Sequence, residues 1–274
     1  MVSGFEVRSP IIISVANQKG GVGKTTTTIN LAAALAERGA NVLLVDLDPQ
    51  GNASTGLGFP PSERQKTTYD ILIDESPLFE AVIPTGIDRV FICPSSADLS
   101  SADIQLMANE KRSFLLHDSL RDPAMAKLEL DFILIDCPPS LSLLTVNALV
   151  ASHAVLVPLQ AEFFALEGLS QLMLTIREVR RSANPALRIE GVVLTMVDGR
   201  NRLSQQVESD ARKTLGELVF KTTIPRNVRL SEAPSYAQSV LDYDGGSKGA
   251  DAYRTLAQEV LARHPTALRN RETA

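Results

Sequence analysis

The sequence predicts an α/β protein with a single doubly wound, mostly parallel sheet and helices on both faces. Short apolar, β-branched runs alternate along the chain with stretches of helical periodicity. A run such as 132–135 is apolar at every position, as in strands that are covered on both faces. A glycine-rich segment, residues 17–26, lies between the first strand-like run and the first helical stretch. Repeated strand–helix units of this kind place neighbouring strands parallel.

The expected elements follow one another in regular order. Residues 26–38 form the clearest helix, because they are rich in Ala and Leu and are followed by Gly39, a residue that often ends helices. Residues 166–181 form a second helix, which places on one face Leu169, Leu172, Met173 and Ile176. The predicted strands are residues 11–16, 42–45, 90–92, 132–135, 154–157 and 192–196.

Length and composition indicate an ordinary globular protein with one large domain. The chain has 274 residues, of which 44% are hydrophobic and 22% charged, and these values exclude disordered and collagen-like chains. No Pro/Gly/Ser-rich linker and no internal repeat divides the sequence. We therefore expect a short N-terminal extension at 1–10, one domain at 11–264 and a polar tail at 265–274.

The sequence also predicts a cytoplasmic protein without a membrane partner. No apolar run approaches the roughly 18–20 residues that span a bilayer, and the N-terminus lacks the pattern of a signal peptide. The two cysteines, Cys93 and Cys137, do not form a C-x-x-C pair. Their spacing fits a reducing compartment and argues against a zinc site or a disulfide scaffold. We expect both to be small buried side chains.

The charge of the chain is unevenly distributed. The net charge is −5, from 27 basic and 32 acidic side chains, which by itself argues against nucleic acid as a partner. Residues 177–230, however, contain 11 basic and 6 acidic side chains, a balance of +5 that leaves −10 for the rest of the chain. The average therefore hides a polarised molecule with one electropositive segment.

The glycine-rich segment is the most informative part of the sequence, because it connects a strand to a helix. Its glycines allow successive backbone N–H groups to turn toward one anion at the helix N-terminus. Lys24 would reach the β- and γ-phosphates of a nucleotide, and the Thr25 hydroxyl would bind Mg²⁺. The residues expected to contact the nucleotide are Gly20, Gly21, Val22, Gly23, Lys24, Thr25 and Thr26. The general G-x-x-x-x-G-K-[ST] pattern has Gly where this chain has Gln18, and Lys19 is a second lysine within the loop.

This variant, Lys-Gly-Gly-x-Gly-Lys-Thr-Thr, resembles the deviant Walker A loop of the ParA/MinD group of P-loop ATPases. The resemblance to the ParA/Soj partitioning branch extends through nearly the whole chain. The matching blocks, in family order, are residues 19–26, 45–52, 135–140, 162–168, 195–200 and 224–234. The resemblance implies a deviant Walker A P-loop fold that uses ATP and Mg²⁺ as cofactors and hydrolyses ATP. The absence of an Asn-Lys-x-Asp element agrees with adenine rather than guanine as the base.

Three aspartates are candidates for the chemistry of hydrolysis. Asp136 follows an apolar strand, where a carboxylate can hold Mg²⁺ through its water shell, although an aspartate there could also cap the next turn. Asp48 matches the acidic residue with which the family orients or activates the attacking water, and it could also contact the metal. Asp46 either lines the site or caps the end of its strand. Met196, Pro225 and Asn227 match positions that could line the base pocket, and packing alone could also explain them.

The resemblance also implies a nucleotide-dependent homodimer. Lys19 is the lysine that crosses to the ATP of the partner subunit in this family, where it would add a positive charge to the transition state. A solvated surface lysine is the alternative interpretation. If the family behaviour applies here, ATP is the link between two subunits that face each other, and hydrolysis separates them.

Three arginines in the electropositive segment are candidates for non-specific binding of double-stranded DNA. Arg200 and Arg229 match the DNA-binding arginines of the family, and Arg226 lies in the same loop as Arg229. Arginine suits phosphate because its planar fork presents parallel donors. Pairing with Glu208, Asp210 or Glu232 is the alternative. Arg177 and its neighbours at 180–181 on one predicted helix are interpreted as a solvated face.

The predicted function is that of a ParA-like ATPase, associated with the nucleoid, that segregates a chromosome or plasmid and is stimulated by a ParB-like activator. Two alternatives stay open: ATP-dependent positioning of a protein cluster, and a regulator or adaptor that uses ATP only for assembly. A membrane-bound MinD-type relative would need an amphipathic C-terminal helix, and residues 268–274 show no apolar face.

Overall fold

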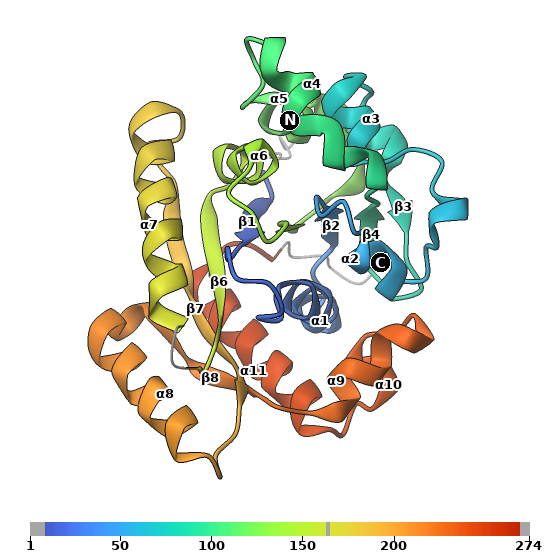
Figure 1. Ribbon diagram of the computed structural model, residues 1–274. Coiled ribbons are helices and arrows are strands. Elements are labelled where there is room, and N and C mark those ends of the chain that lie inside the picture. The colour runs from blue at the N-terminus through green and yellow to red at the C-terminus, as the bar shows by residue number, and fades with distance from the viewer. Residues whose placement is uncertain (1–8, 163–164, 269–274) are drawn as a thin grey trace, which may run out of the picture.

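The alternating strands and helices form one eight-stranded sheet. The computed structural model describes residues 9–162 and 165–268 (Figure 1). The strands lie in the order β3-β4-β2-β5-β1-β6-β7-β8, and each pair is parallel except β3 with β4. The predicted fold class, a doubly wound and mostly parallel sheet, is confirmed.

All six predicted strands are present, and the sheet contains two more. The strands are β1 (Ile11–Val15), β2 (Val42–Asp46), β3 (Ile83–Pro84), β4 (Val90–Cys93), β5 (Phe132–Asp136), β6 (Ala154–Gln160), β7 (Arg188–Val197) and β8 (Val219–Pro225). Strand β3 has only two residues and leaves no periodic signal. Strand β8 lies at the edge of the sheet, and its centre is polar, with Lys221 exposed and its threonine neighbours half-buried. The sequence pattern, which relied on apolar runs, therefore missed both.

The helices of the described chain occupy the intervals between the strands. The first begins at Lys24, two residues earlier than predicted, because Gly23 with φ +86° is its N-cap. The α-helices are α1 (Lys24–Glu37), α2 (Asn52–Gly56), α3 (Thr68–Ile73), α4 (Ala102–Gln105), α5 (Leu115–Leu120), α6 (Leu143–Ala151), α7 (Ala165–Ser182), α8 (Arg202–Leu215), α9 (Val228–Glu232), α10 (Val240–Tyr243) and α11 (Lys248–Arg263). Short 3₁₀ turns connect several of them.

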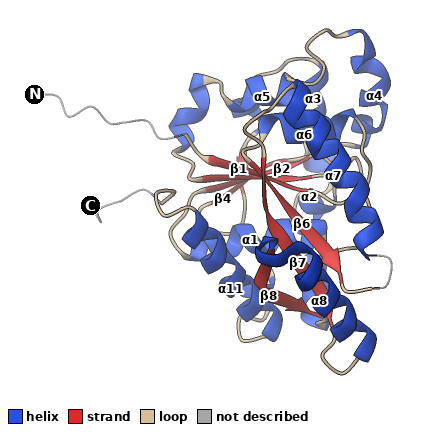
Figure 2. Cartoon of the chain, turned by 90° about the vertical axis from the view of Figure 1, so that its left-hand side faces the viewer, coloured by secondary structure: helices blue, strands red, loops and turns tan. Residues whose placement is uncertain are grey.

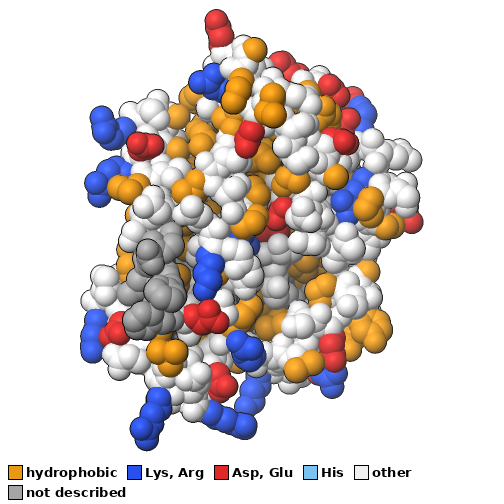
Figure 3. Space-filling view, in the orientation of Figure 1, with side chains coloured by type: hydrophobic (Ala, Val, Ile, Leu, Met, Phe, Trp, Pro, Cys, Tyr) orange, Lys and Arg blue, Asp and Glu red, His pale blue; other side chains and the backbone are white. Residues whose placement is uncertain are grey.

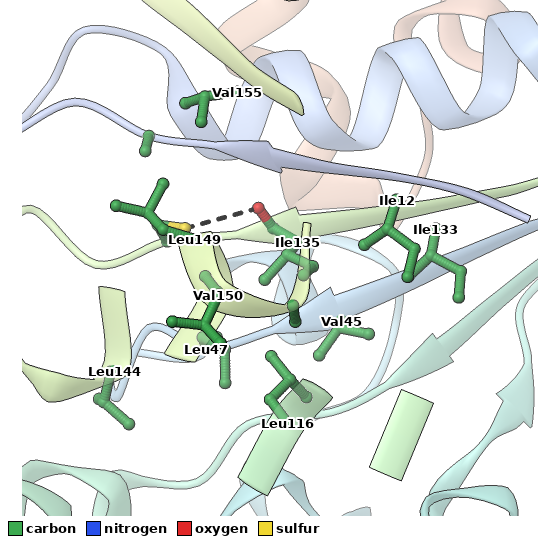
Figure 4. Close-up of a cluster of buried hydrophobic side chains, with 14 of the residues drawn as sticks. Ile12, Val45, Leu47, Leu116, Ile133, Ile135, Leu144, Leu149, Val150 and Val155 are labelled. Atoms are coloured by element: carbon green, nitrogen blue, oxygen red, sulfur yellow. Dashed lines mark hydrogen bonds between the residues drawn. The ribbon is translucent and has the colours of Figure 1, made fainter. Parts of the chain in front are cut away.

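Helices cover both faces of the sheet, as Figure 2 shows with the sheet seen on edge. On one face, α3, α5, α6, α7 and α8 pack against alternate strand side chains, and Figure 4 shows part of this layer around Ile12, Ile135 and Leu149. On the other face, α1, α10 and α11 pack against the remaining side chains, among them Ile13 and Val15. Successive residues of β1 thus enter opposite layers, which is why the strand is apolar except for Ser14, whose buried hydroxyl donates to the carbonyl of Ala148.

The two cysteines and the chain ends agree only partly with expectation. Cys93 and Cys137 are buried free thiols, as predicted, and burial raises the pKa of both. Within the predicted tail, Ala267 and Leu268 are half-buried and pack against the helical layer of α1 and α11, so this part is anchored. Residues 1–8 and 269–274 lie outside the described chain. None of the described helices combines the length and the apolar character that a membrane-spanning helix requires.

Candidate functional site

The carboxyl ends of the central parallel strands bring the predicted site together. Strand β1 lies between β5 and β6, and β5 also pairs with β2. The loops after β1, β2 and β5 therefore meet at one edge of the sheet. In open α/β sheets this edge, at the point where the strand order reverses, is the usual position of a ligand site.

The loop after β1 forms an open cradle at the N-terminus of α1. Gly21 and Gly23 have φ values of +71° and +86°, a region that other residues rarely adopt. None of the backbone N–H groups of residues 20–25 meets an acceptor elsewhere in the described chain. The Thr195 hydroxyl on β7 donates to the carbonyl of Val22 at 2.8 Å and holds the loop from the side. This arrangement of unpaired donors at a helix N-terminus is suited to an anion.

Lys24 and Thr25 extend from the first turn of α1 into this site. Lys24 is only 7% exposed, and its Nζ donates to the carbonyl of Lys19 at 3.1 Å. Burial lowers the pKa of Lys24, while the negative charges of Asp136 and Asp48 act in the opposite direction. The Thr25 hydroxyl donates to Asp136 Oδ2 at 2.7 Å.

Asp136 and Asp46 are adjacent in the sheet, as β5 and β2 pair these two residues directly. Both are fully buried. Burial raises the pKa of Asp136, with the charge of Asp46 as the next cause, and burial also raises the pKa of Asp46. Asp46 Oδ2 accepts hydrogen bonds from the N–H and the hydroxyl of Ser54 at 2.9 and 2.6 Å. Asp46 is thus tied to α2, and this contact supports the interpretation of a structural strand-end residue.

Asp48 lies two residues beyond β2 and is 7% exposed. Its Oδ1 accepts the N–H of Gln50 at 3.0 Å, and Oδ2 has no hydrogen-bond partner in the part of the chain that is described. The backbone carbonyl of Asp48 accepts two hydrogen bonds, from Ser95 Oγ at 2.6 Å and from the N–H of Gly51 at 2.8 Å. One carboxylate oxygen therefore stays available to a ligand while the backbone is held from behind.

The donor set fits a triphosphate with Mg²⁺. The carboxylates of Asp48 and Asp136 both act on the one buried ammonium, and Asp46 adjoins Asp136, so the site can take further positive charge. Within the described residues no group of three His, Cys, Asp or Glu side chains could hold a metal by itself. Mg²⁺ commonly keeps several waters and takes one or two protein oxygens together with substrate phosphates, and Thr25 and Asp136 offer such oxygens.

Lys19 does not reach into the site of its own subunit. Its Nζ forms an ion pair with Glu162 Oε2 at 3.0 Å, across the mouth of the loop, and Gln160 donates to the other oxygen of Glu162 at 2.6 Å. The side chains of Lys19 and Glu162 are 38% and 49% exposed, so the pair is in contact with water. Such pairs typically contribute about 0–1 kcal/mol, which leaves Lys19 free to change partner.

The three residues predicted to line a base pocket come together only in part. Met196, at φ +53°, is half-buried and lines a cavity of about 530 Å³ together with Arg226 and Glu162. Pro225 ends β8 opposite Val197 and does not line this cavity. The Asn227 side chain caps α9, because its Oδ1 accepts the N–H of Arg229 at 2.8 Å, and this hydrogen bond alone explains an asparagine at this position.

The predicted DNA-binding arginines are all exposed, and their surroundings differ. Arg200 and Arg226 follow β7 and β8, and their guanidinium groups form no ion pair with any residue the structure describes. Arg229 pairs with Glu232 at 2.8 Å and with Asp244 at 3.1 Å, and the hydrogen bond to Glu232 raises the pKa of Arg229. Lys and Arg side chains gather at the lower edge of the molecule in Figure 3, around α8 and the loop after β7.

Sequence reasoning gave no role to two residues that the structure places at this site. Glu162 is in one of the matched blocks, yet its contact with Lys19 spans 143 residues and leaves no local signal. Arg64 lies in a polar loop without any motif, and its guanidinium reaches the loop that carries Asp48. Only the folded chain brings these side chains to the site.

Comparison with known proteins agrees with this geometry. A family model described as an AAA domain matches residues 11–189. The chromosome partitioning protein ParA of Caulobacter vibrioides is 54% identical over 252 residues, 92% of this chain and 94% of that protein. The sporulation initiation inhibitor protein Soj of Bacillus subtilis is 48% identical over 251 residues, 92% of this chain and 98% of that protein.

Solved structures give the same result. A Mycobacterium smegmatis protein described as cobyrinic acid a,c-diamide synthase, with bound ADP and magnesium, is 36% identical with a TM-score of 0.80 and covers 94% of this chain and 97% of its own. The cell division ATPase MinD of Pyrococcus furiosus is 29% identical with a TM-score of 0.76 and covers 92% of this chain and 99% of its own. The chain therefore belongs to the ParA/Soj family of chromosome-partitioning P-loop ATPases.

Proposed function

We propose that this protein is an ATP-driven partitioning switch: ATP joins two subunits, the dimer binds DNA without sequence preference, and hydrolysis stimulated by a ParB-like activator releases it. The identity of 54% with a chromosome partitioning protein over 92% of the chain carries this proposal. The dimer would be found on the nucleoid, and a chromosome is the cargo that the names of the relatives favour.

The nucleotide site would use the cradle after β1. Backbone N–H groups of residues 20–25 and Lys24 would bind the phosphates, and Thr25 with Asp136 would hold Mg²⁺, directly or through water. Bound Mg²⁺ neutralises part of the phosphate charge. The free oxygen of Asp48 would orient the attacking water and would also contact the water shell of the metal. Met196 would contact the base from β7, while Pro225 at the end of β8 and Asn227 at the start of α9 would support the neighbouring backbone.

Lys19 would supply the link between subunits. In the single chain its ammonium is paired with Glu162 and is far less buried than Lys24. In the dimer the Lys19 ammonium would leave this water-exposed carboxylate and bind the phosphates of the partner subunit's ATP. It would thereby exchange a weak ion pair for a charge-assisted hydrogen bond inside an interface. The two copies of Lys19 would thereby make dimerisation depend on the triphosphate.

DNA binding would follow from dimerisation, because two copies of the basic surface would lie on one assembly. If the dimer neutralises about four phosphates, the logarithm of its affinity should fall against log[salt] with a slope of about −3.6, at roughly 0.9 per contact. Filter binding to unrelated duplexes, with ATP and Mg²⁺ or with ADP, measures this slope. Equal affinity with and without ATP, or a protein that stays monomeric at saturating ATP and Mg²⁺, would contradict the proposal.

Arg229→Glu should remove most of the DNA affinity while the ATP-dependent dimer remains. The change takes away two phosphate contacts per dimer and should reduce the salt slope by about 1.8. Because Glu232 and Asp244 already adjoin this position, Arg229→Ala serves as a second variant without added repulsion. Arg177→Glu, on an exposed position of α7, is the matched control with the same change of charge. Equal loss in both glutamate variants would assign the effect to net charge instead of to Arg229.

A further inference from the structure

The loop that carries Asp48 is held at two points, and one arginine contacts both. The carbonyl of Asp48 accepts the Ser95 hydroxyl at 2.6 Å and the N–H of Gly51 at 2.8 Å. Arg64 Nη1 donates to the carbonyl of Ser95 at 3.0 Å, and Nη2 donates to the carbonyl of Gly51 at 3.2 Å. The guanidinium therefore connects the two residues whose donors fix Asp48, without touching Asp48 itself.

Arg64 is anchored by two further contacts. Its Nε donates to the carbonyl of Phe59 at 2.9 Å, and Nη2 also donates to Thr55 Oγ1 at 2.8 Å. The side chain is half-buried and forms no ion pair with a described residue, and burial lowers the pKa of Arg64. All four hydrogen bonds of this charged side chain go to neutral oxygens, three in the segment 51–59 and one on Ser95. No ion pair compensates for its loss of water, and only the charge of Asp46 favours the ionised form, so we interpret Arg64 as placed for geometry.

The backbone of Gly51 shows how closely Arg64 approaches this loop. Gly51 has a φ of +60°, and a Cβ added there would lie 2.2 Å from Nη1 of Arg64. The glycine therefore serves both the left-handed turn after Asp48 and the contact with the guanidinium.

We propose that Arg64 is a positioning residue for ATP hydrolysis, which keeps Asp48 in place through Gly51 and Ser95. This inference rests on the proposed role of Asp48. Lysine should not substitute for Arg64, because a single nitrogen with three N–H groups cannot reproduce four hydrogen bonds donated by three separate nitrogens of a planar fork. A displacement of a catalytic group by about 1 Å can lower a rate by about 100-fold, so loss of this connection should affect the chemical step more than binding.

The main test compares Arg64→Ala and Arg64→Lys with the wild type in single-turnover hydrolysis at saturating ATP and Mg²⁺. Both variants should hydrolyse ATP at least about 10-fold more slowly, with a Kd for ATP within about 3-fold of the wild type. Adding Arg64→Ala to Asp48→Ala should cause no further loss, because Arg64 acts through Asp48. An unchanged rate in Arg64→Ala, or full rescue by Arg64→Lys, would overturn the inference.

A second readout needs no nucleotide. In the ATP-free protein, Arg64→Ala should speed hydrogen exchange of the amides of Asp48, Gln50 and Gly51, because the turn that the Gly51 N–H closes onto Asp48 loses the contact at the Gly51 carbonyl. Arg254→Ala is the matched control, because Arg254 also makes several contacts, with Glu37 and the carbonyl of Gly245, beside the far end of α1. It should lower the melting temperature without changing exchange at 48–51 or the hydrolysis rate. The same exchange pattern in both variants would show that Arg64 has only a general structural role.

Thr55→Val keeps the inference testable if Arg64→Ala does not fold, because it removes one anchor of the guanidinium at an exposed position. It should slow hydrolysis severalfold at unchanged ATP affinity, and a wild-type rate would count against the inference.

Failure of the proposed function is recognised separately. If Asp48→Ala hydrolyses ATP at the wild-type rate, both the proposed role of Asp48 and the inference about Arg64 are wrong. If Asp48→Ala is slow and Arg64→Ala is not, only the role of Arg64 is wrong.

Discussion

Lys24→Ala is expected to abolish ATP binding at micromolar concentrations of nucleotide. The ammonium of Lys24 is buried at the N-terminus of α1, beside loop N–H groups that have no acceptor within the described residues. A hydrogen bond to a charged group contributes about 1.5–3 kcal/mol, and the side chain would reach two phosphates. The loss should therefore be about 3 kcal/mol or more, which is a Kd at least about 100-fold weaker. Equilibrium binding of a fluorescent ATP analogue measures it directly.

The matched control for this prediction is Lys19→Ala, in the same loop. The ammonium of Lys19 is paired with Glu162 at 3.0 Å and does not enter the site of its own subunit. This variant should bind ATP with near wild-type affinity as a monomer and should fail to dimerise. Thermal unfolding without nucleotide shows whether each variant is folded. A Kd of Lys24→Ala within about 3-fold of the wild type would contradict the role assigned to this lysine.

Asp48→Ala is expected to leave ATP bound and to trap the dimer on DNA. Its Oδ2 is the free carboxylate oxygen of the loop after β2, while Oδ1 accepts the N–H of Gln50. A side chain that positions or activates water contributes about 10²–10⁴-fold to a rate. Phosphate release should therefore slow by about 100-fold or more. DNA together with the basic N-terminal peptide of a ParB-like activator should stimulate release by the wild type and should leave the rate of the variant unchanged.

Gel filtration with ATP and Mg²⁺ provides the second measurement for Asp48. The variant should elute as a dimer long after the wild type has returned to monomer, because dissociation requires hydrolysis. Asp48→Asn keeps the size of the side chain and an acceptor for Gln50, so it should be slow as well if the negative charge is what acts on water. A monomeric Asp48→Ala at saturating ATP, or an Asp48→Asn with a wild-type rate, would show that Asp48 has a different task.

Much of the fold could be predicted from local pattern. Strands β1, β2, β5 and β6 are covered on both faces, so their apolar runs are strong signals, and the Ala/Leu-rich composition of α1 is equally clear. The sequence did not predict β3, which has two residues, or β8, whose exposed edge position permits polar residues. Anchoring of Ala267 and Leu268 was also missed, since two apolar residues in a polar segment form no pattern.

The sequence by itself determined the family and predicted the phosphate-binding role of the loop, because the loop residues lie together within one strand–helix turn. Only the tertiary structure decided which distant side chains become neighbours at the site. Asp46 lies next to Asp136 across paired strands, Glu162 pairs with Lys19, and Arg64 supports the loop that carries Asp48. Contacts between segments far apart in the chain depend on strand order and on loop geometry. Neither of these leaves a spacing in the sequence from which the partner could be identified.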